Sequence, residues 1–129
     1  IIHVQGWIAM LMPLYCKHYY TDEPILANTK VISSIFNTPF EEPLSSNLIK
    51  KLAFDGLDGE LTKGLKTPNF SALAKNAIAN SDGLIIADND VNKSVKKEML
   101  SSKKPLLHSS SKENFEEDYK EFYTNQILN

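Results

Sequence analysis

Trp7 occupies the place in this sequence where a side chain is best positioned to contact a ligand, because it follows the apolar stretch IIHV and a turn at Gly6. Open parallel α/β sheets bind their ligands at the carboxyl ends of their strands. An aromatic ring there is either a ligand contact or part of the core, and aromatic side chains dominate core burial. The sequence leaves both interpretations of Trp7 open.

A second candidate is the run DNDVN at residues 88–92, in which oxygen-bearing side chains alternate as they do in a calcium-binding loop. Such a loop needs glycine at its sixth position and a bidentate glutamate at its twelfth, where this chain has Lys93 and Met99. The run is therefore predicted to be a strand-to-helix turn, with Asp90 as the cap of the next helix.

The remaining histidine, cysteine and glutamate residues do not combine into a metal or acid-base site. Cys16 and His18 are two residues apart on a predicted helix and face different ways. His3 lies within a predicted strand, where it is expected to be a hydrogen-bonded core residue. Glu41 and Glu42 are neighbours in an extended segment and point apart, which indicates a solvated loop. We predict no metal site, no cofactor and no catalytic residue among them.

The composition is that of an ordinary globular domain. The 129 residues are 42% apolar and 23% charged, which suffices for one domain with a core of its own. The net charge is -2, and all 14 basic residues are lysines, so the chain has no rigid guanidinium fork for phosphates or bases. This composition argues against a nucleic-acid partner.

The start of the chain carries no signal of export or membrane insertion. Its longest apolar run, residues 6–16, is shorter than the roughly 20 residues that span a bilayer and is interrupted by Pro13. Ile1 and Ile2 carry no basic segment of a signal peptide. We expect a cytoplasmic protein without a membrane partner, with Cys16 as a core thiol. A strand that begins at residue 1 suggests a fragment of a longer chain.

Short apolar runs alternate with helical segments along the whole chain. Runs rich in branched residues predict strands at 1–4, 29–36, 83–87 and 105–108. Capping and stop signals predict helices at 47–54, at 72–80 behind Ser71, at 90–100 and, from an apolar stripe, at 115–127. Residues 7–15 predict a buried first helix that is apolar nearly all round and kinks or begins at Pro13. This alternation predicts an α/β fold, a three-layer sandwich around a mainly parallel, Rossmann-like sheet.

The stretch IIHVQGWIAMLMPLY resembles the strand-turn-helix of bacterial glycogen synthases and plant starch synthases, whose pattern is roughly V-H-x-H-D-W-H-A-G-L-x-P-x-Y. The positions that match in register are His3, Trp7, Ala9, Leu11, Pro13 and Tyr15. Downstream, TKVISSIFN is similar to a family strand that ends in T-x-H-N, with Asn37 in the asparagine position. The segment from residue 79 to 99 also resembles the family, with Asp82 and Glu98 at its acidic positions. The similarity is greatest to short bacterial homologues of the N-terminal lobe alone.

This resemblance implies an architecture and an activity. Enzymes of this family move glucose from ADP-glucose or UDP-glucose to an α-1,4-glucan, in the cleft between the two Rossmann-like lobes of a GT-B glycosyltransferase. The chain, residues 1–129, would form a single domain, the later part of the N-terminal lobe. The resemblance assigns substrate binding to Gln5, Trp7 and Asn37. It also places Ile8 and Phe36 where the family has histidines of its catalytic site.

The resemblance therefore predicts a glycosyltransferase domain that is not active as this chain alone, because isoleucine and phenylalanine cannot hydrogen-bond a sugar hydroxyl. The alternative is a non-catalytic glucan-binding, regulatory or scaffold module. An α-glucan or a nucleotide sugar is the expected partner in either case. A sheet edge left uncovered by a missing part of the lobe would favour a homo-oligomer.

Overall fold

The computed structural model describes residues 1–109 and 114–129 and contains one four-stranded sheet. Its strands are β1 (Ile2–Gln5), β2 (Val31–Ile35), β3 (Gly83–Ile86) and β4 (Leu106–His108). They lie in the order β1-β2-β3-β4, and all three pairings are parallel. The four predicted strands and the parallel sheet are thus confirmed, with ends that differ by at most two residues.

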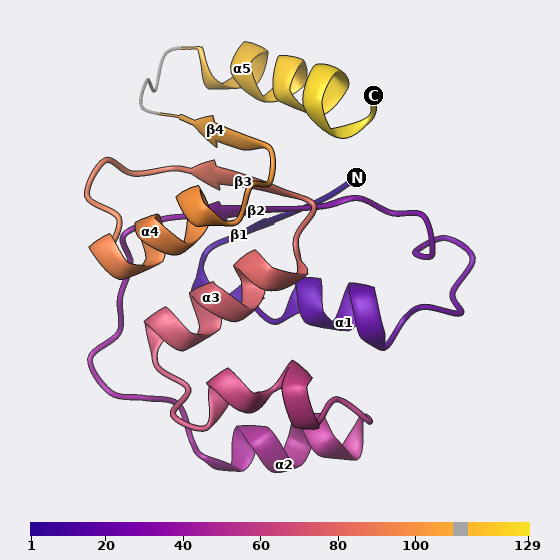
Figure 1. Ribbon diagram of the computed structural model, residues 1–129, viewed down its shortest axis with the longest axis vertical. Helices are drawn as coiled ribbons and strands as arrows, with labels where there is room; N and C mark the ends of the chain where they lie inside the picture. Colours follow the sequence, from indigo (N-terminus) through magenta and orange to yellow (C-terminus); the bar gives the residue numbers. More distant parts are fainter. Residues whose placement is uncertain (110–113) are drawn as a thin grey trace.

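Helices cover both faces of this sheet (Figure 1). They are α1 (Met12–His18), α2 (Asn47–Phe54), α3 (Phe70–Asn80), α4 (Lys93–Ser101) and α5 (Phe115–Phe122). Shorter turns are η1 (Trp7–Ala9), η2 (Gly59–Leu61), η3 (Lys63–Leu65) and the π-helical η4 (Tyr123–Ile127). Each strand pairs with the next one in sequence, so right-handed crossovers place α1, α3 and α4 on one face. α5 lies on the other face, which completes the three predicted layers.

β2 shows why the sheet is buried on both faces, since all five of its residues are buried. Side chains alternate along a strand. Val31 and Ile35 therefore pack on the side of α1 and α3, while Ile32 packs beneath α5. The serines between them are also buried and are hydrogen-bonded, Ser33 to Ser81 and Ser34 to His3. This pattern is typical of a central strand in a three-layer fold.

The core beneath α5 is small and closely packed. It consists of Ile32, Ile85, Phe122 and Ile127, with Leu107 and two tyrosines partly buried against it. Gly83 lies directly below, and a Cβ added there would collide with the Ile127 side chain and crowd the Phe122 ring. Glycine at this position lets η4 and the end of α5 approach the sheet.

The predicted start points of two helices are wrong. α3 begins at Phe70 and is capped by Asn69, whose side chain accepts a hydrogen bond from Ala72 N at 2.9 Å, and not by Ser71. α4 begins after Asn92, which accepts from Ser94 N at 2.9 Å, rather than at Asp90. In both cases an asparagine next to the first helical residue reaches the unpaired N–H groups of the first turn.

The first helix also differs from its prediction. The chain makes the short turn η1 and only then begins α1, with Pro13 in the first turn, as one of the two alternatives predicted. The side chain of Ile8 is 83% exposed and that of Met12 is 38% exposed, so the expectation of burial all round is wrong. The break between η1 and α1 turns Ile8 away from the core, whereas Leu14 and Cys16 are buried.

Two further helices follow the prediction. α2 has the predicted bounds, and Ser45 Oγ accepts a hydrogen bond from Asn47 N before its first turn. At the C-terminus, the predicted apolar stripe faces the sheet through Phe122 and Ile127, both buried. Phe115, the first residue of the stripe, is 46% exposed, and the last turn is π-helical.

Candidate functional site

The carboxyl edge of the sheet is the candidate site, because every strand ends there. β1 ends at Gln5, whose side chain is exposed, and Gly6 follows with φ of 75°, a backbone conformation that favours glycine. This turn directs Trp7 back towards the sheet. The Trp7 ring is half-buried against the main core, with its centroid 5.0 Å from that of Phe40. Trp7 thus packs at the periphery of the main core, and the rest of its side chain remains exposed to solvent.

The ends of β2 and β3 are joined by a hydrogen bond. The backbone N–H of Asn37 donates to Asp88 Oδ2 at 2.7 Å, while the Asn37 side chain is exposed. Sequence reasoning did not select Asp88 as a site residue, although its position directly after the third strand was a usable signal. Phe36, before Asn37, is half-buried, and Ile8 is exposed near the end of β1.

The chemistry available at this edge is that of neutral amides, carboxylates, aromatic rings and the exposed imidazole of His108, the last residue of β4. The turn between β3 and α4 contributes two carboxylates, Asp88 and Asp90. Carboxylates accept hydrogen bonds from hydroxyl groups but repel a diphosphate. The edge can therefore bind a neutral polyol more readily than a nucleotide diphosphate.

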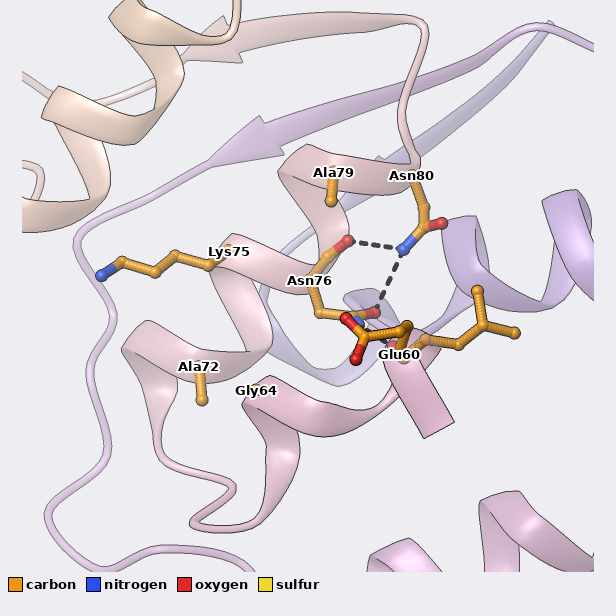
Figure 2. Close-up of a pocket in the computed structure, with 8 residues that line it drawn as sticks. Glu60, Gly64, Ala72, Lys75, Asn76, Ala79 and Asn80 are labelled. Carbon is orange, nitrogen blue, oxygen red and sulfur yellow. Dashed lines mark hydrogen bonds between the residues drawn. The ribbon is translucent and has the colours of Figure 1, made fainter. Parts of the chain in front are cut away.

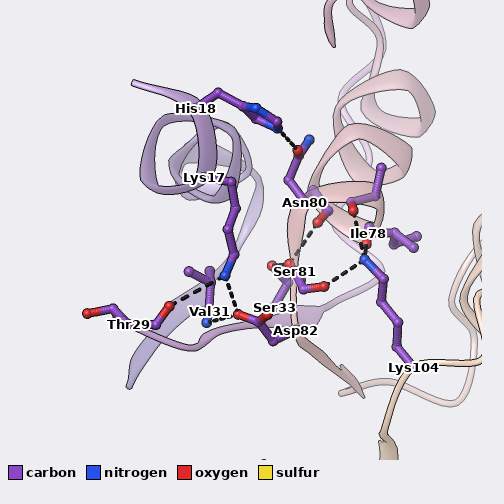
Figure 3. A network of polar contacts seen from close by, with 12 residues as sticks. Lys17, His18, Thr29, Val31, Ser33, Ile78, Asn80, Ser81, Asp82 and Lys104 are labelled. Carbon is purple, nitrogen blue, oxygen red and sulfur yellow. Dashed lines mark hydrogen bonds and ion pairs between the residues drawn. The ribbon is translucent and has the colours of Figure 1, made fainter. Parts of the chain in front are cut away.

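The opposite, amino edge of the sheet holds a polar network that is structural (Figure 3). Asp82 Oδ2 accepts from Lys17 Nζ at 2.6 Å and from Val31 N at 2.7 Å. Burial alone would raise the pKa of Asp82, but the hydrogen bonds from Lys17 and Val31 outweigh it and lower the pKa. The network ties α1 to β2 and β3. Asp82 is the residue matched to an acidic position of the resembled family. It stabilises the fold at the amino edge, away from the carboxyl ends of the strands.

A hollow of about 300 Å³ lies between α3 and the turns η2 and η3 (Figure 2). Its two asparagines already have partners within the protein. Asn76 Nδ2 donates to the Leu61 carbonyl, and Asn80 Nδ2 donates to the Asn76 carbonyl, both at 2.9 Å. The Asn76 bond ties α3 to η2, and the Asn80 bond lies within α3. The hollow is not near the strand ends that carry the candidate site.

His3 and Cys16 have structural roles, as predicted. His3 Nε2 and Ser34 Oγ are hydrogen-bonded at 2.6 Å, and His3 Nδ1 pairs with the Tyr123 hydroxyl, also at 2.6 Å. Cys16 is buried, and burial raises the pKa of its thiol. Among residues 1–109 and 114–129, no three histidine, cysteine or acidic side chains are grouped so as to hold a metal ion. None of the helices described is both long and apolar enough to cross a bilayer.

A family model described as the starch synthase catalytic domain matches residues 1–109. The chain belongs to this family. No curated protein and no solved structure matches it. Membership of the starch synthase catalytic domain family agrees with the parallel Rossmann-like sheet and indicates a glycosyltransferase role. The match covers all four strands and ends before α5, so α5 and η4 lie outside the matched region.

Proposed function

We propose that the chain is a domain of a glycogen- or starch-synthase-type glycosyltransferase that binds α-glucan at the carboxyl edge of its sheet and does not transfer glucose by itself. In the whole enzyme the donor is ADP-glucose or UDP-glucose, the acceptor is an α-1,4-glucan, and this chain is the later part of the N-terminal lobe. Family membership supports the reaction class. One observation carries the proposal. The carboxyl edge exposes amides that can bind a sugar, and it has Ile8 and Phe36 where the resembled pattern has histidines.

Glucosyl transfer needs groups that stabilise the transition state. A leaving diphosphate needs cations or N–H donors, and the developing positive charge on the sugar needs polar groups beside it. At the edge, Ile8 is 83% exposed where the resembled pattern has a histidine, and Phe36 stands where it has another. The two acidic side chains beyond β3 add negative charge to this edge, and that charge would repel a diphosphate. These features support an edge that lacks the two histidines of the resembled pattern and a cationic clamp for the diphosphate.

Glucan binding by the same edge is supported by a different set of side chains. Gln5 and Asn37 expose amides at the ends of neighbouring strands, and the half-buried Trp7 follows two residues after Gln5. An amide both donates and accepts hydrogen bonds, as sugar hydroxyl groups do. The Trp7 ring can pack against the apolar face of a sugar while the amides bind its hydroxyl groups. The edge is therefore suited to a neutral sugar chain.

The absence of transfer is tested by incubating the purified chain with glycogen and radiolabelled ADP-glucose or UDP-glucose. We expect incorporation into glycogen to equal that of a protein-free control. Incorporation that rises in proportion to the amount of protein would overturn the proposal that this chain does not transfer glucose.

Glucan binding at the edge is tested through the fluorescence of Trp7, the sole tryptophan. Maltoheptaose at millimolar concentration is expected to shift or quench the emission. Asn37→Ala and Gln5→Ala should each weaken the response several-fold, and Gln126→Ala, an exposed amide on η4, should leave it unchanged. An emission spectrum that is the same with and without maltoheptaose would contradict glucan binding at this edge.

A further inference from the structure

Phe54 is the most exposed large apolar side chain of the described structure, at 92% exposure. It is the last residue of α2, whose opposite side holds the buried Leu52. Burial of an aromatic ring is favourable, so an exposed ring can stabilise a ligand that packs against it. The ring lines a hollow of about 480 Å³ with four polar side chains, those of Asn47, Lys50, Lys51 and Asp55.

The helix arranges these groups in one outward stripe. Asn47, Lys50 and Phe54 are spaced by three and then four residues, which places them on the same side of α2. At 1.5 Å per residue the stripe is about 10 Å long. It offers an amide, an ammonium group and a ring face in line, so an extended ligand could contact all three.

Asp55 supplies a carboxylate that is already held in place. The Tyr15 hydroxyl donates to Asp55 Oδ2 at 2.6 Å. This hydrogen bond, with burial and the negative charge of Asp55, raises the pKa of Tyr15 to about 12, so the tyrosine remains a donor at neutral pH. The carboxylate therefore keeps a fixed orientation beside the hollow, which lowers the cost of ordering it when a ligand binds.

We infer that the hollow beside Phe54 is a second, surface binding site for an α-glucan chain, an inference that rests on the proposed function. A glucose ring has an apolar C–H face and a rim of hydroxyl groups. The Phe54 ring suits the face, and Asn47, Lys50 and Asp55 suit the rim. With two lysines and one aspartate the lining has a net charge of only +1, and it has no arginine fork to bind a phosphate in two places. A single exposed ring is too small to anchor a protein interface, which needs about 1,000 Å² or more.

The site is separate from the carboxyl edge. α2 lies on the far side of α3 from the sheet (Figure 1). A glucan held on α2 therefore leaves the ends of the strands accessible. A branched glucan particle could engage both places, and the second contact would then raise the apparent affinity without changing the first.

The test is native electrophoresis of the chain in gels with and without glycogen. We expect glycogen to retard the wild type, Phe54→Ala to lose that retardation several-fold, and Phe54→Trp to retain it. Phe115→Ala is the matched control, since Phe115 is another exposed phenylalanine, and it should migrate as the wild type does. Thermal unfolding of the Phe54 variants should match the wild type because the ring is almost fully exposed.

A second readout places a tryptophan at the site, as Phe54→Trp in a Trp7→Phe background. Maltoheptaose is expected to change its emission, and AMP or ADP is not. A response to the nucleotides alone, or to nothing, would overturn the surface glucan site. Equal retardation of wild type and Phe54→Ala would overturn this site and leave binding at the carboxyl edge standing. Absence of retardation in the wild type would overturn both sites.

Discussion

The Lys104 side chain caps the carboxyl end of α3. Its Nζ lies 2.6 Å from the Ile78 carbonyl, 2.7 Å from that of Ala79 and 2.6 Å from that of Ser81 (Figure 3). The last carbonyl groups of a helix have no partner within it, and a cation is favourable at that end. Burial lowers the pKa of Lys104, and the negative charge of Asp82 opposes that shift.

We predict that Lys104→Met lowers the free energy of unfolding by about 1.5 kcal/mol, because the three carbonyls lose a charged donor at a partly buried place. Lys97→Met, at an exposed position on α4, should change it by less than about 0.5 kcal/mol. Urea unfolding followed by circular dichroism measures both. Equal effects of the two substitutions would show that Lys104 does not cap α3.

The sequence predicted single residues well where burial alone decides their role, and poorly where a partner does. Cys16 was predicted to be in the core because it is an isolated cysteine in an apolar run. The asparagine caps of α3 and α4 were missed because a serine or an aspartate nearby is an equally good cap by type. The carboxylate of Asp88 was missed because its partner, Asn37 N, is 51 residues away.

At the scale of elements, the approach of α5 to the sheet depends on Gly83. We predict that Gly83→Ala destabilises the protein by about 1–3 kcal/mol, because the added methyl group meets Ile127 and Phe122 and must displace them. Combined with Ile127→Ala, the substitution should cost less than the sum of the two single changes. A double-mutant cycle from urea unfolding measures this coupling, and strict additivity would contradict the contact.

A second link between α5 and the sheet depends on pH. His3 on β1 is hydrogen-bonded to Tyr123 of η4 and to Ser34 of β2, with the Tyr119 ring against it. A neutral imidazole supplies one donor and one acceptor for these two bonds. Burial lowers the pKa of His3, so the folded protein holds it neutral at pH values where the unfolded chain is already protonated.

The stabilisation from His3 is therefore present above about pH 6.5 and is lost as the pH falls through the lowered pKa of the folded state. We predict that hydrogen exchange of α5 accelerates between about pH 7 and pH 5 relative to that of α3. His3→Gln should remove this pH dependence, and His108→Gln, at an exposed position, should leave it intact. A pH dependence that persists in His3→Gln would contradict the link.

The elements themselves were largely predictable, and their long-range contacts were not. Branched apolar runs identified all four strands, because their pattern is local. The apolar stripe from Phe115 onwards identified the last helix but did not show what it covers. Its contact with His3 joins residues 120 positions apart. The break between η1 and α1 was obscured because Trp7, Ile8 and Leu11 are equally apolar, so composition could not show that Ile8 points outward.

At the scale of the whole molecule, the two faces of the sheet are covered in different ways. Three crossovers in one direction place α1, α3 and α4 on one face, and those elements lie within the region matched to the starch synthase family. The described elements that cover the other face are α5 and η4, which follow the matched region. The apolar residues under them are Ile32, Ile85 and Leu107. The described C-terminal elements thus keep that face from water.

We predict that deletion of residues 110–129 makes the chain self-associate, because it exposes this apolar face while leaving the main core intact. Light scattering after gel filtration should give a larger mass than that of the full chain at the same concentration, and a dye that binds apolar surface should fluoresce more strongly. Phe122→Ala is the control, since it weakens the same core without removing its cover. If the shortened chain keeps the mass of the full chain and does not bind the dye, α5 is not what shields the sheet.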